Sequence, residues 1–223
     1  MKKEISIQIP EFEMSVTGIL NLPKTANCVI LLAHGAGAGM RHPFMEQISE
    51  SLADQGLGTL RFNFIYMEKG NKAPDRPKKA IAAISASLEA LKTISQLPIL
   101  LAGKSFGGRM ASHLAALQAL EGVVGLVFLG FPLHASGKPG IERTAHLQEV
   151  SLPMLFLQGT RDTLAQLPMI ESVCDQLANS ELQIIDGADH SFKMLKRSGK
   201  TQDEVIGELS VLVRKFADNL ITT

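Results

Sequence analysis

The chain has 223 residues, and its 22 Lys and Arg balance 22 Asp and Glu, so the formal net charge is zero. This balance excludes a basic face for nucleic acid or a polybasic membrane patch. No apolar run reaches the ~18 residues of a membrane span, and the N-terminus lacks the apolar core of a signal peptide. Cys28 and Cys174 have no metal-site spacing. We therefore expect one cytoplasmic domain over residues 1–223, with no metal and no membrane contact.

The first part of the chain predicts mainly strands. Residues 4–9 (EISIQI) and 14–20 (MSVTGIL) alternate apolar and polar side chains, which is typical of half-buried antiparallel strands. Residues 28–33 (CVILLA) are continuously apolar, as expected of a strand that is covered on both faces. A helix over 42–55 and a strand over 58–64 follow.

Helices and strands then alternate to the end of the chain. Thr201 and Glu204 form a capping box at the start of the last helix. The alternation implies right-handed crossovers, so the predicted fold is α/β, a doubly wound and mostly parallel sheet with an N-terminal antiparallel hairpin. Ligands of such sheets bind beyond the carboxyl ends of the strands. The remaining predicted helices are 75–97, 106–120, 164–178 and 201–220, and the remaining strands are 98–103, 123–131, 153–159 and 182–186.

A glycine-rich loop, HGAGAG, follows the strand over 28–33. A dinucleotide-binding loop needs the spacing G-x-G-x-x-G. If Gly35 is the first glycine of this motif, the third glycine should stand at residue 40, which is Met40. If Gly37 is the first, the third should stand at residue 42, which is His42. Neither register fits, so we expect no nicotinamide cofactor and no other organic cofactor.

Residues 103–107 read Gly-Lys-Ser-Phe-Gly, a G-x-S-x-G motif between a predicted strand and a predicted helix. In that context the motif indicates a nucleophile elbow, in which a sharp turn exposes the serine hydroxyl above the sheet. Ser105 is therefore the candidate nucleophile. A serine that only caps the helix in a tight glycine turn is the alternative interpretation.

A nucleophilic serine needs a base and an acid that orients the base. His190 follows the predicted strand over 182–186, and Asp162 follows the strand over 153–159, so both lie at carboxyl ends of strands. Asp186 and Asp189 are alternative acids. Both are so close to His190 in the chain that we expect their side chains to point away from its ring.

The glycine-rich loop is expected to supply half of an oxyanion hole. The backbone N–H of Ala36, or that of Gly35, is the candidate first donor, and the N–H of Phe106 is the second. Glycines at this position let the backbone approach a substrate closely. His34 is more simply interpreted as holding the loop by a hydrogen bond than as a base.

Several cationic side chains are candidate substrate-binding groups. A cluster of them near the serine would attract an acidic substrate. Ion pairing within the protein is the alternative interpretation, and Arg109 in the first turn of a helix is unfavourable unless it is paired. The candidates are His34, Lys104, Arg109, Arg143 and His146.

Several stretches together resemble those of α/β hydrolases over nearly the whole chain. They include HGAGAGMRHPFM, RFNFIYMEKG, PDRP, GKSFGGRM, FLGFPLH and FLQGTRD. The chain is most similar to dienelactone-hydrolase-like members, and to a group with a testis-expressed protein and a subunit of a histone-acetyltransferase complex, the NSL complex. The resemblance implies a triad of Ser105, Asp162 and His190. It departs from true dienelactone hydrolases, which have a cysteine at the elbow.

Two functions remain open at this level. The first is a serine hydrolase that cleaves a small acyl substrate, a carboxylester or thioester, through an acyl-enzyme. The second is a non-catalytic binding or scaffold module, because some relatives act as subunits of complexes and a fold alone does not establish turnover. A protein partner is expected only by that analogy. Segment 132–152 is where relatives carry a helical cap, and its ~20 residues predict a minimal one.

Overall fold

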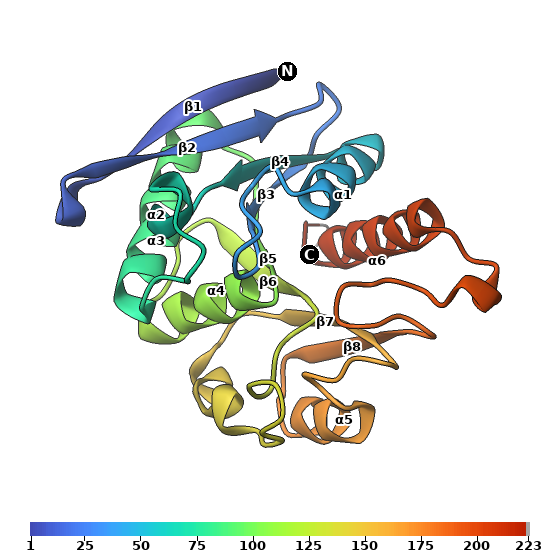
Figure 1. The fold of residues 1–223 in the computed structure, drawn as a ribbon. Coiled ribbons are helices and arrows are strands. Elements are labelled where there is room, and N and C mark those ends of the chain that lie inside the picture. Colours follow the sequence, from blue (N-terminus) through green and yellow to red (C-terminus); the bar gives the residue numbers. More distant parts are fainter. Residues whose placement is uncertain (222–223) are drawn as a thin grey trace.

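The computed structural model describes residues 1–221 and contains one eight-stranded sheet with helices on both faces (Figure 1). The strand order is β1-β2-β4-β3-β5-β6-β7-β8. The strands are β1 (Lys2–Ile9), β2 (Met14–Asn21), β3 (Cys28–Ala33), β4 (Leu57–Phe62), β5 (Ile99–Lys104), β6 (Val123–Leu129), β7 (Met154–Gly159) and β8 (Ser180–Ile185).

The predicted N-terminal hairpin is confirmed. β1 pairs antiparallel with β2 from Lys2 opposite Asn21 to Ile9 opposite Met14, and β2 pairs antiparallel with β4. Every other neighbouring pair in the sheet is parallel. Apolar and polar side chains alternate along β1 because only its inward side chains, such as Ile7, are buried. β3 is apolar throughout because it is buried along its whole length.

The helices form two layers (Figure 1). α1 and α6 pack on one face of the sheet, where Ile48 and Leu209 join a single apolar core, and α3, α4 and α5 pack on the other face. In the described part of the chain, no helix is both long and apolar enough to span a membrane. The helices are α1 (Pro43–Asp54), α2 (Ile65–Glu68), α3 (Pro77–Ile94), α4 (Phe106–Leu117), α5 (Leu167–Asp175) and α6 (Gln202–Ile221).

The predicted elements are all present, but their ends differ for local reasons. The strand expected to reach 131 ends at Leu129, because Gly130 turns the chain with a φ of +72°. The helix expected from 75 starts at Pro77, since a residue before proline is held out of the helical region. Segment 132–152, expected to be a minimal cap, contains a 3-10 helix over Glu142–Glu149, which packs its Leu147 into the core.

The direction of winding reverses at β3. From β3 the chain adds β4 on one side and β5 on the other, so the loops after β3 and β5 leave the sheet next to each other. Such a switch point opens a crevice at the carboxyl edge of a doubly wound sheet. The loop after β3 is the glycine-rich loop, and the turn after β5 holds Ser105.

The capping box at the start of α6 is formed as predicted. The Glu204 N–H donates to the Thr201 hydroxyl at 3.2 Å, and the Thr201 N–H donates to the Glu204 carboxylate at 2.6 Å. Two N–H groups that lack helical acceptors are satisfied in this way.

Loss of this cap should weaken the fold measurably. We expect Thr201→Ala to lower the free energy of unfolding by about 1 kcal/mol in urea titrations. Thr93→Ala is the matched control, because the Thr93 hydroxyl bonds only to Ala90 within α3 and is exposed, and it should change stability by less than about 0.5 kcal/mol. Equal effects of the two substitutions would contradict the cap's role.

Candidate active site

Ser105 occupies an unusual backbone conformation between β5 and α4. Its φ is 50° and its ψ is −110°, outside the regions that a residue with a side chain normally adopts. Such a conformation costs on the order of 1–3 kcal/mol and persists only where its surroundings impose it. It turns the chain at once from strand to helix and leaves the hydroxyl partly exposed at the edge of the sheet.

Three glycines make this turn possible. A Cβ at Gly103 would lie 2.2 Å from the backbone nitrogen of Gly108, and a Cβ at Gly107 would lie 2.6 Å from the carbonyl oxygen of Ala33. A Cβ at Gly108 would lie 2.8 Å from the carbonyl oxygen of Gly103. These are backbone atoms that cannot move aside, so α4 approaches β3 and β5 only because the β-carbons are absent.

Ser105, His190 and Asp162 form one hydrogen-bonded line. His190 Nε2 lies 2.8 Å from Ser105 Oγ, and His190 Nδ1 lies 2.7 Å from Asp162 Oδ2. A carboxylate only accepts, so Nδ1 carries the ring proton and Nε2 accepts from the serine hydroxyl. The three side chains come from the loops after β5, β7 and β8.

Asp162 is held as a buried carboxylate. Its side chain is 0% exposed, and it accepts hydrogen bonds from the Leu164 N–H at 2.8 Å and the Gln158 amide at 2.5 Å. Burial alone would raise the pKa of Asp162, but the hydrogen bond from His190 and these two others outweigh it and hold that pKa below its ordinary value. Asp162 is thus ionised at neutral pH.

The two competing acids have other partners. The Asp189 carboxylate accepts the N–H groups of Ser191 at 2.8 Å and Lys193 at 2.9 Å, and therefore shapes the turn that follows His190. Asp186 accepts from the Thr160 hydroxyl at 3.2 Å. Within residues 1–221, neither carboxylate bonds to the His190 ring, and Asp162 alone does so.

The glycine-rich loop brings backbone N–H groups, unpaired within residues 1–221, to the cleft that contains the serine. The N–H groups of Gly35 and Ala36 have no hydrogen-bond partner among the described residues, and both residues line the same cleft as Ser105. The Phe106 N–H lies in the first turn of α4, where a helix supplies no acceptor of its own. Donors of this kind suit a developing oxyanion.

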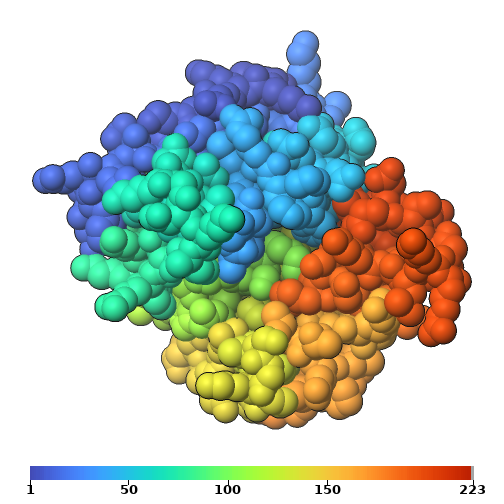
Figure 2. Space-filling view, viewed as in Figure 1, coloured from blue at the N-terminus to red at the C-terminus, as the bar shows by residue number. Residues whose placement is uncertain are grey.

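The cleft around these groups has a volume of about 600 Å³. It opens where the loop after β3, the serine turn and the last third of the chain meet, and these light-blue, green and orange-red segments converge near the middle of Figure 2. Its lining holds two lysines and no acidic side chain. The lining residues are Gly35, Ala36, Ala38, His42, Pro43, Phe44, Met45, Gln47, Lys104, Ser105, Leu164, His190, Ser191, Lys193 and Gln202.

The family model of an alpha/beta hydrolase domain matches residues 26–218. The chain belongs to the α/β hydrolase family. The match spans the serine turn, the glycine-rich loop and the loops that carry Asp162 and His190.

The fold of this α/β hydrolase is similar to that of several solved structures. A serine hydrolase homologue from Coxiella burnetii has 24% sequence identity and a TM-score of 0.75, with 96% of each chain covered. Dienelactone hydrolase from Anabaena variabilis has 23% identity and a TM-score of 0.78, with 99% of this chain and 98% of that one covered. The esterase domain of a Rhodothermus marinus protein has 16% identity and a TM-score of 0.75, with 99% of each chain covered. Likeness at these identities establishes the fold alone.

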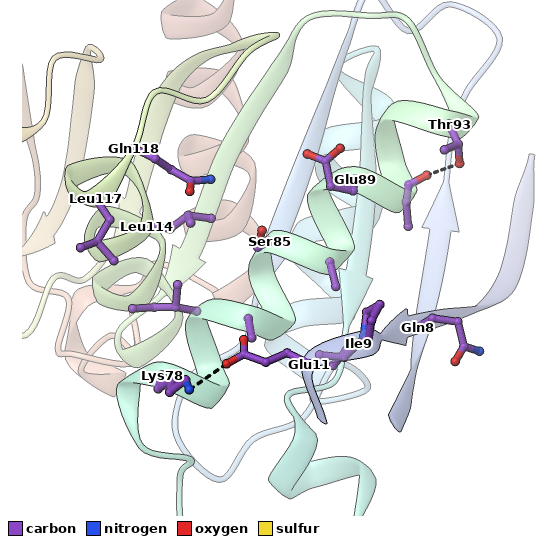
Figure 3. A pocket seen from close by; sticks show the side chains of 15 residues that line it. Gln8, Ile9, Glu11, Lys78, Ser85, Glu89, Thr93, Leu114, Leu117 and Gln118 are labelled. Carbon is purple, nitrogen blue, oxygen red and sulfur yellow. Dashed lines mark hydrogen bonds and ion pairs between the residues drawn. The ribbon is translucent and has the colours of Figure 1, made fainter. Parts of the chain in front are cut away.

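A second hollow in this α/β hydrolase is larger, about 850 Å³, but lies away from the serine. It is a groove between β1, α3 and α4, lined by a mixture of apolar and polar side chains and bordered by the Lys78–Glu11 ion pair (Figure 3). None of the candidate site residues lines it. The smaller cleft is therefore the candidate active site, because it contains both Ser105 and His190. In the described residues, no group of three His, Cys, Asp or Glu side chains is placed to hold a metal.

Polar side chains from the end of β4 and from α2 hold the glycine-rich loop of the hydrolase. The Tyr66 hydroxyl accepts the Gly37 N–H at 2.9 Å, and Asn63 Oδ1 accepts the Met40 N–H at 3.0 Å. Arg61 donates to the Met40 carbonyl at 2.9 Å. Sequence reasoning missed these supports. Their only signal was the stretch RFNFIYMEKG, which is one of the stretches that carry the family resemblance.

His34 supports the same loop, and its assignment as a substrate-binding residue is corrected. The ring has no exposed surface: Nδ1 lies 2.7 Å from the Gly35 carbonyl oxygen, and Nε2 accepts the Phe64 N–H at 3.2 Å. Burial lowers the pKa of His34 to about 4, so the ring is neutral at physiological pH. A neutral, enclosed imidazole holds the loop and cannot touch a substrate.

Three of the other cationic candidates also lie outside the cleft lining. His146 stacks on His113 with ring centres 3.6 Å apart and lies 2.8 Å from the Ser112 hydroxyl. Burial lowers the pKa of His146 to about 4, so it carries no charge at neutral pH. Arg143 donates to the His134 carbonyl at 2.9 Å. His146 thus joins the 3-10 helix to α4, whereas Arg109 Nε is buried without a partner among the described residues. Lys104 is the only one of the candidate cations that lines the cleft.

The close packing at the serine turn gives a direct stability test. We expect Gly107→Ala to lower the free energy of unfolding by about 2–3 kcal/mol, because the new methyl group meets fixed backbone oxygens. Gly207→Ala, in α6 with open space around the added methyl, should instead gain about 0.5–1 kcal/mol. Denaturant titrations of both variants measure the contrast, and equal stability would contradict the packing argument.

Proposed function

We propose that this α/β hydrolase is a serine hydrolase that cleaves the acyl bond of a small carboxylester or thioester. One observation carries the proposal: the Ser105–His190–Asp162 hydrogen-bonded line, with the serine in a strained conformation beside an open cleft. Strain of this kind is maintained where it serves chemistry. A serine that only capped the helix would need neither a base nor a buried acid.

The proposed reaction begins with attack of Ser105 Oγ on the acyl carbon, while His190 Nε2 takes the hydroxyl proton. Asp162 fixes the ring tautomer and stabilises the imidazolium that forms. The Phe106 N–H and the Ala36 or Gly35 N–H bind the oxyanion, and one such donor contributes about 3–4 kcal/mol to the transition state. His190 returns the proton to the leaving group, and water then releases the acyl group by the same steps.

The shape of the cleft supports a small substrate. The segment over the site is short, and its 3-10 helix packs against α4 and the core instead of closing over Ser105. An esterase domain and a dienelactone hydrolase are among the similar folds, and we take their names as support for an oxygen ester as the substrate of this chain. Within the family, we place the chain among dienelactone-hydrolase-like members, closest to the group with a testis-expressed protein and a subunit of the NSL complex. It has a serine where true dienelactone hydrolases use cysteine.

The nucleophile is tested with a fluorophosphonate probe, which reacts covalently with activated serines. The wild-type protein should be labelled, and Ser105→Ala should lose both the labelling and any hydrolysis of p-nitrophenyl acetate while it stays folded. Labelling that persists in the variant would assign the nucleophile to another residue. A wild-type protein that is never labelled would favour a non-catalytic binding or scaffold module with a protein partner.

The acid is tested by comparing two aspartates at equal folded fraction. Asp162→Asn should slow labelling and hydrolysis by up to ~10⁴-fold, because the amide favours the wrong histidine tautomer. Asp189→Asn should cost less than about tenfold, or 1.4 kcal/mol in the barrier, because an amide oxygen still accepts the N–H groups of the turn. The reverse ranking would transfer the role to Asp189.

A further inference from the structure

Lys104 is the residue before the serine, and its side chain runs towards the base. Its aliphatic stem packs against Gly35 of the glycine-rich loop. Its Nζ donates to the backbone carbonyl of His190 at 2.5 Å and lies 5.4 Å from the centre of the Phe192 ring. The side chain thus contacts the loop after β3 and the loop after β8 together.

The end of β6 leaves room for this ammonium group. A Cβ at Gly130 would lie 3.1 Å from Lys104 Nζ and 3.5 Å from His190 Nδ1. Gly130 also has a φ of +72°, which disfavours any larger residue. The lysine and the imidazole therefore share a space that the glycine leaves open.

Among the described residues, no donor within its own loop reaches the His190 carbonyl. The Asp189 carboxylate fixes the turn that follows, and Phe192 is buried with a φ of +59° and stacks on Phe44. Within residues 1–221, the His190 carbonyl has no hydrogen-bond donor other than Lys104. Without that donor, the carbonyl of His190 itself would have no hydrogen bond, although the turn after it would still be held by Asp189.

We propose that Lys104 is a positioning residue, which anchors the His190 backbone through its carbonyl so that the imidazole stays aimed at Ser105. This inference rests on the proposed hydrolase function. It assigns Lys104 a role other than the expected binding of an acidic substrate, because its ammonium donates to the His190 carbonyl.

The charge of Lys104 is consistent with this position. Burial lowers the pKa of Lys104 to about 8, and the carboxylates of Asp162 and Asp189, which face it, limit the drop. The group is therefore mostly charged at pH 7. Charge-assisted hydrogen bonds are about twice as strong as neutral ones, which suits an anchor.

The test measures how fast a neutral fluorophosphonate inactivates the protein, separating the inactivation rate constant kinact from the binding constant KI. Lys104→Met keeps the length of the side chain and removes the donor. We expect kinact to fall about 10- to 100-fold at unchanged KI, the loss caused by a misplacement of about 1 Å. Lys104→Arg keeps a charged donor and should retain more of the rate.

The matched control is Lys193→Met, which removes the other lysine of the cleft lining. The loss of kinact in Lys104→Met should exceed that in Lys193→Met at least tenfold. Equal losses would mean that the charge of the cleft matters and the anchor does not. If Lys104→Met has a normal kinact and its KM rises only for the anionic ester p-nitrophenyl hemisuccinate, Lys104 is an anion-binding residue and the proposal is overturned.

A second readout does not depend on turnover. The Nδ1 proton between His190 and Asp162 should give a downfield proton resonance, identified by its loss in His190→Gln. It should broaden or vanish in Lys104→Met and persist in Lys104→Arg; persistence in both would overturn the proposal. If Lys104→Met does not fold, Lys104→Leu takes its place, because leucine also lacks a donor. A wild-type protein that shows the resonance but is never labelled would disprove the hydrolase function and leave the anchor testable.

Discussion

The site depends on one steric constraint, the absence of β-carbons around the serine turn. The positive φ of Ser105 is tolerated because α4 lies against β5 and β3 at distances that only Gly103, Gly107 and Gly108 allow. With any β-carbon there, the helix would move away from the sheet. The hydroxyl would then leave the line to His190, and the Phe106 N–H would leave the cleft.

The other half of the site, the glycine-rich loop after β3, is held by hydrogen bonds from side chains. The glycine-rich loop is restrained by Arg61 and Asn63 at the end of β4 and by Tyr66 in α2. The neutral, buried ring of His34 contacts the Gly35 carbonyl and accepts the Phe64 N–H, so it links the loop to the segment after β4. Because β3 lies between β4 and β5 at the switch point, one sheet edge sets the position of the loop relative to the serine.

The sequence predicted the features that depend on local patterns of residues or on which residues directly follow a strand. The parallel sheet, the hairpin and the cap of α6 follow from local patterns. Asp162 and His190 could be chosen because both come directly after apolar runs, and carboxyl ends of parallel strands share one edge. The choice of Asp162 over Asp189 needed only the rule that adjacent side chains point apart.

The direction of a long or buried side chain could not be predicted in this way. Lys104 and Arg109 both flank the serine in sequence, yet Lys104 points to the His190 loop and Arg109 lies outside the cleft. His146 looked like a cation and is neutral, because it is buried against His113 and near Arg109. Such outcomes depend on which elements pack over a residue, and a single sequence does not state that.

The position of the His190 ring and the ionisation of Asp162 depend on the same contacts. A buried carboxylate is costly unless hydrogen bonds or a cation compensate it. Asp162 has both, since His190, Gln158 and the Leu164 N–H donate to it and the Lys104 ammonium lies nearby. The same groups fix where Asp162 and His190 sit, so the contacts that keep the acid ionised also keep the imidazole aimed. A substitution that disturbs one must disturb the other, and for this reason a positional readout such as the Nδ1 proton is informative about the charge as well.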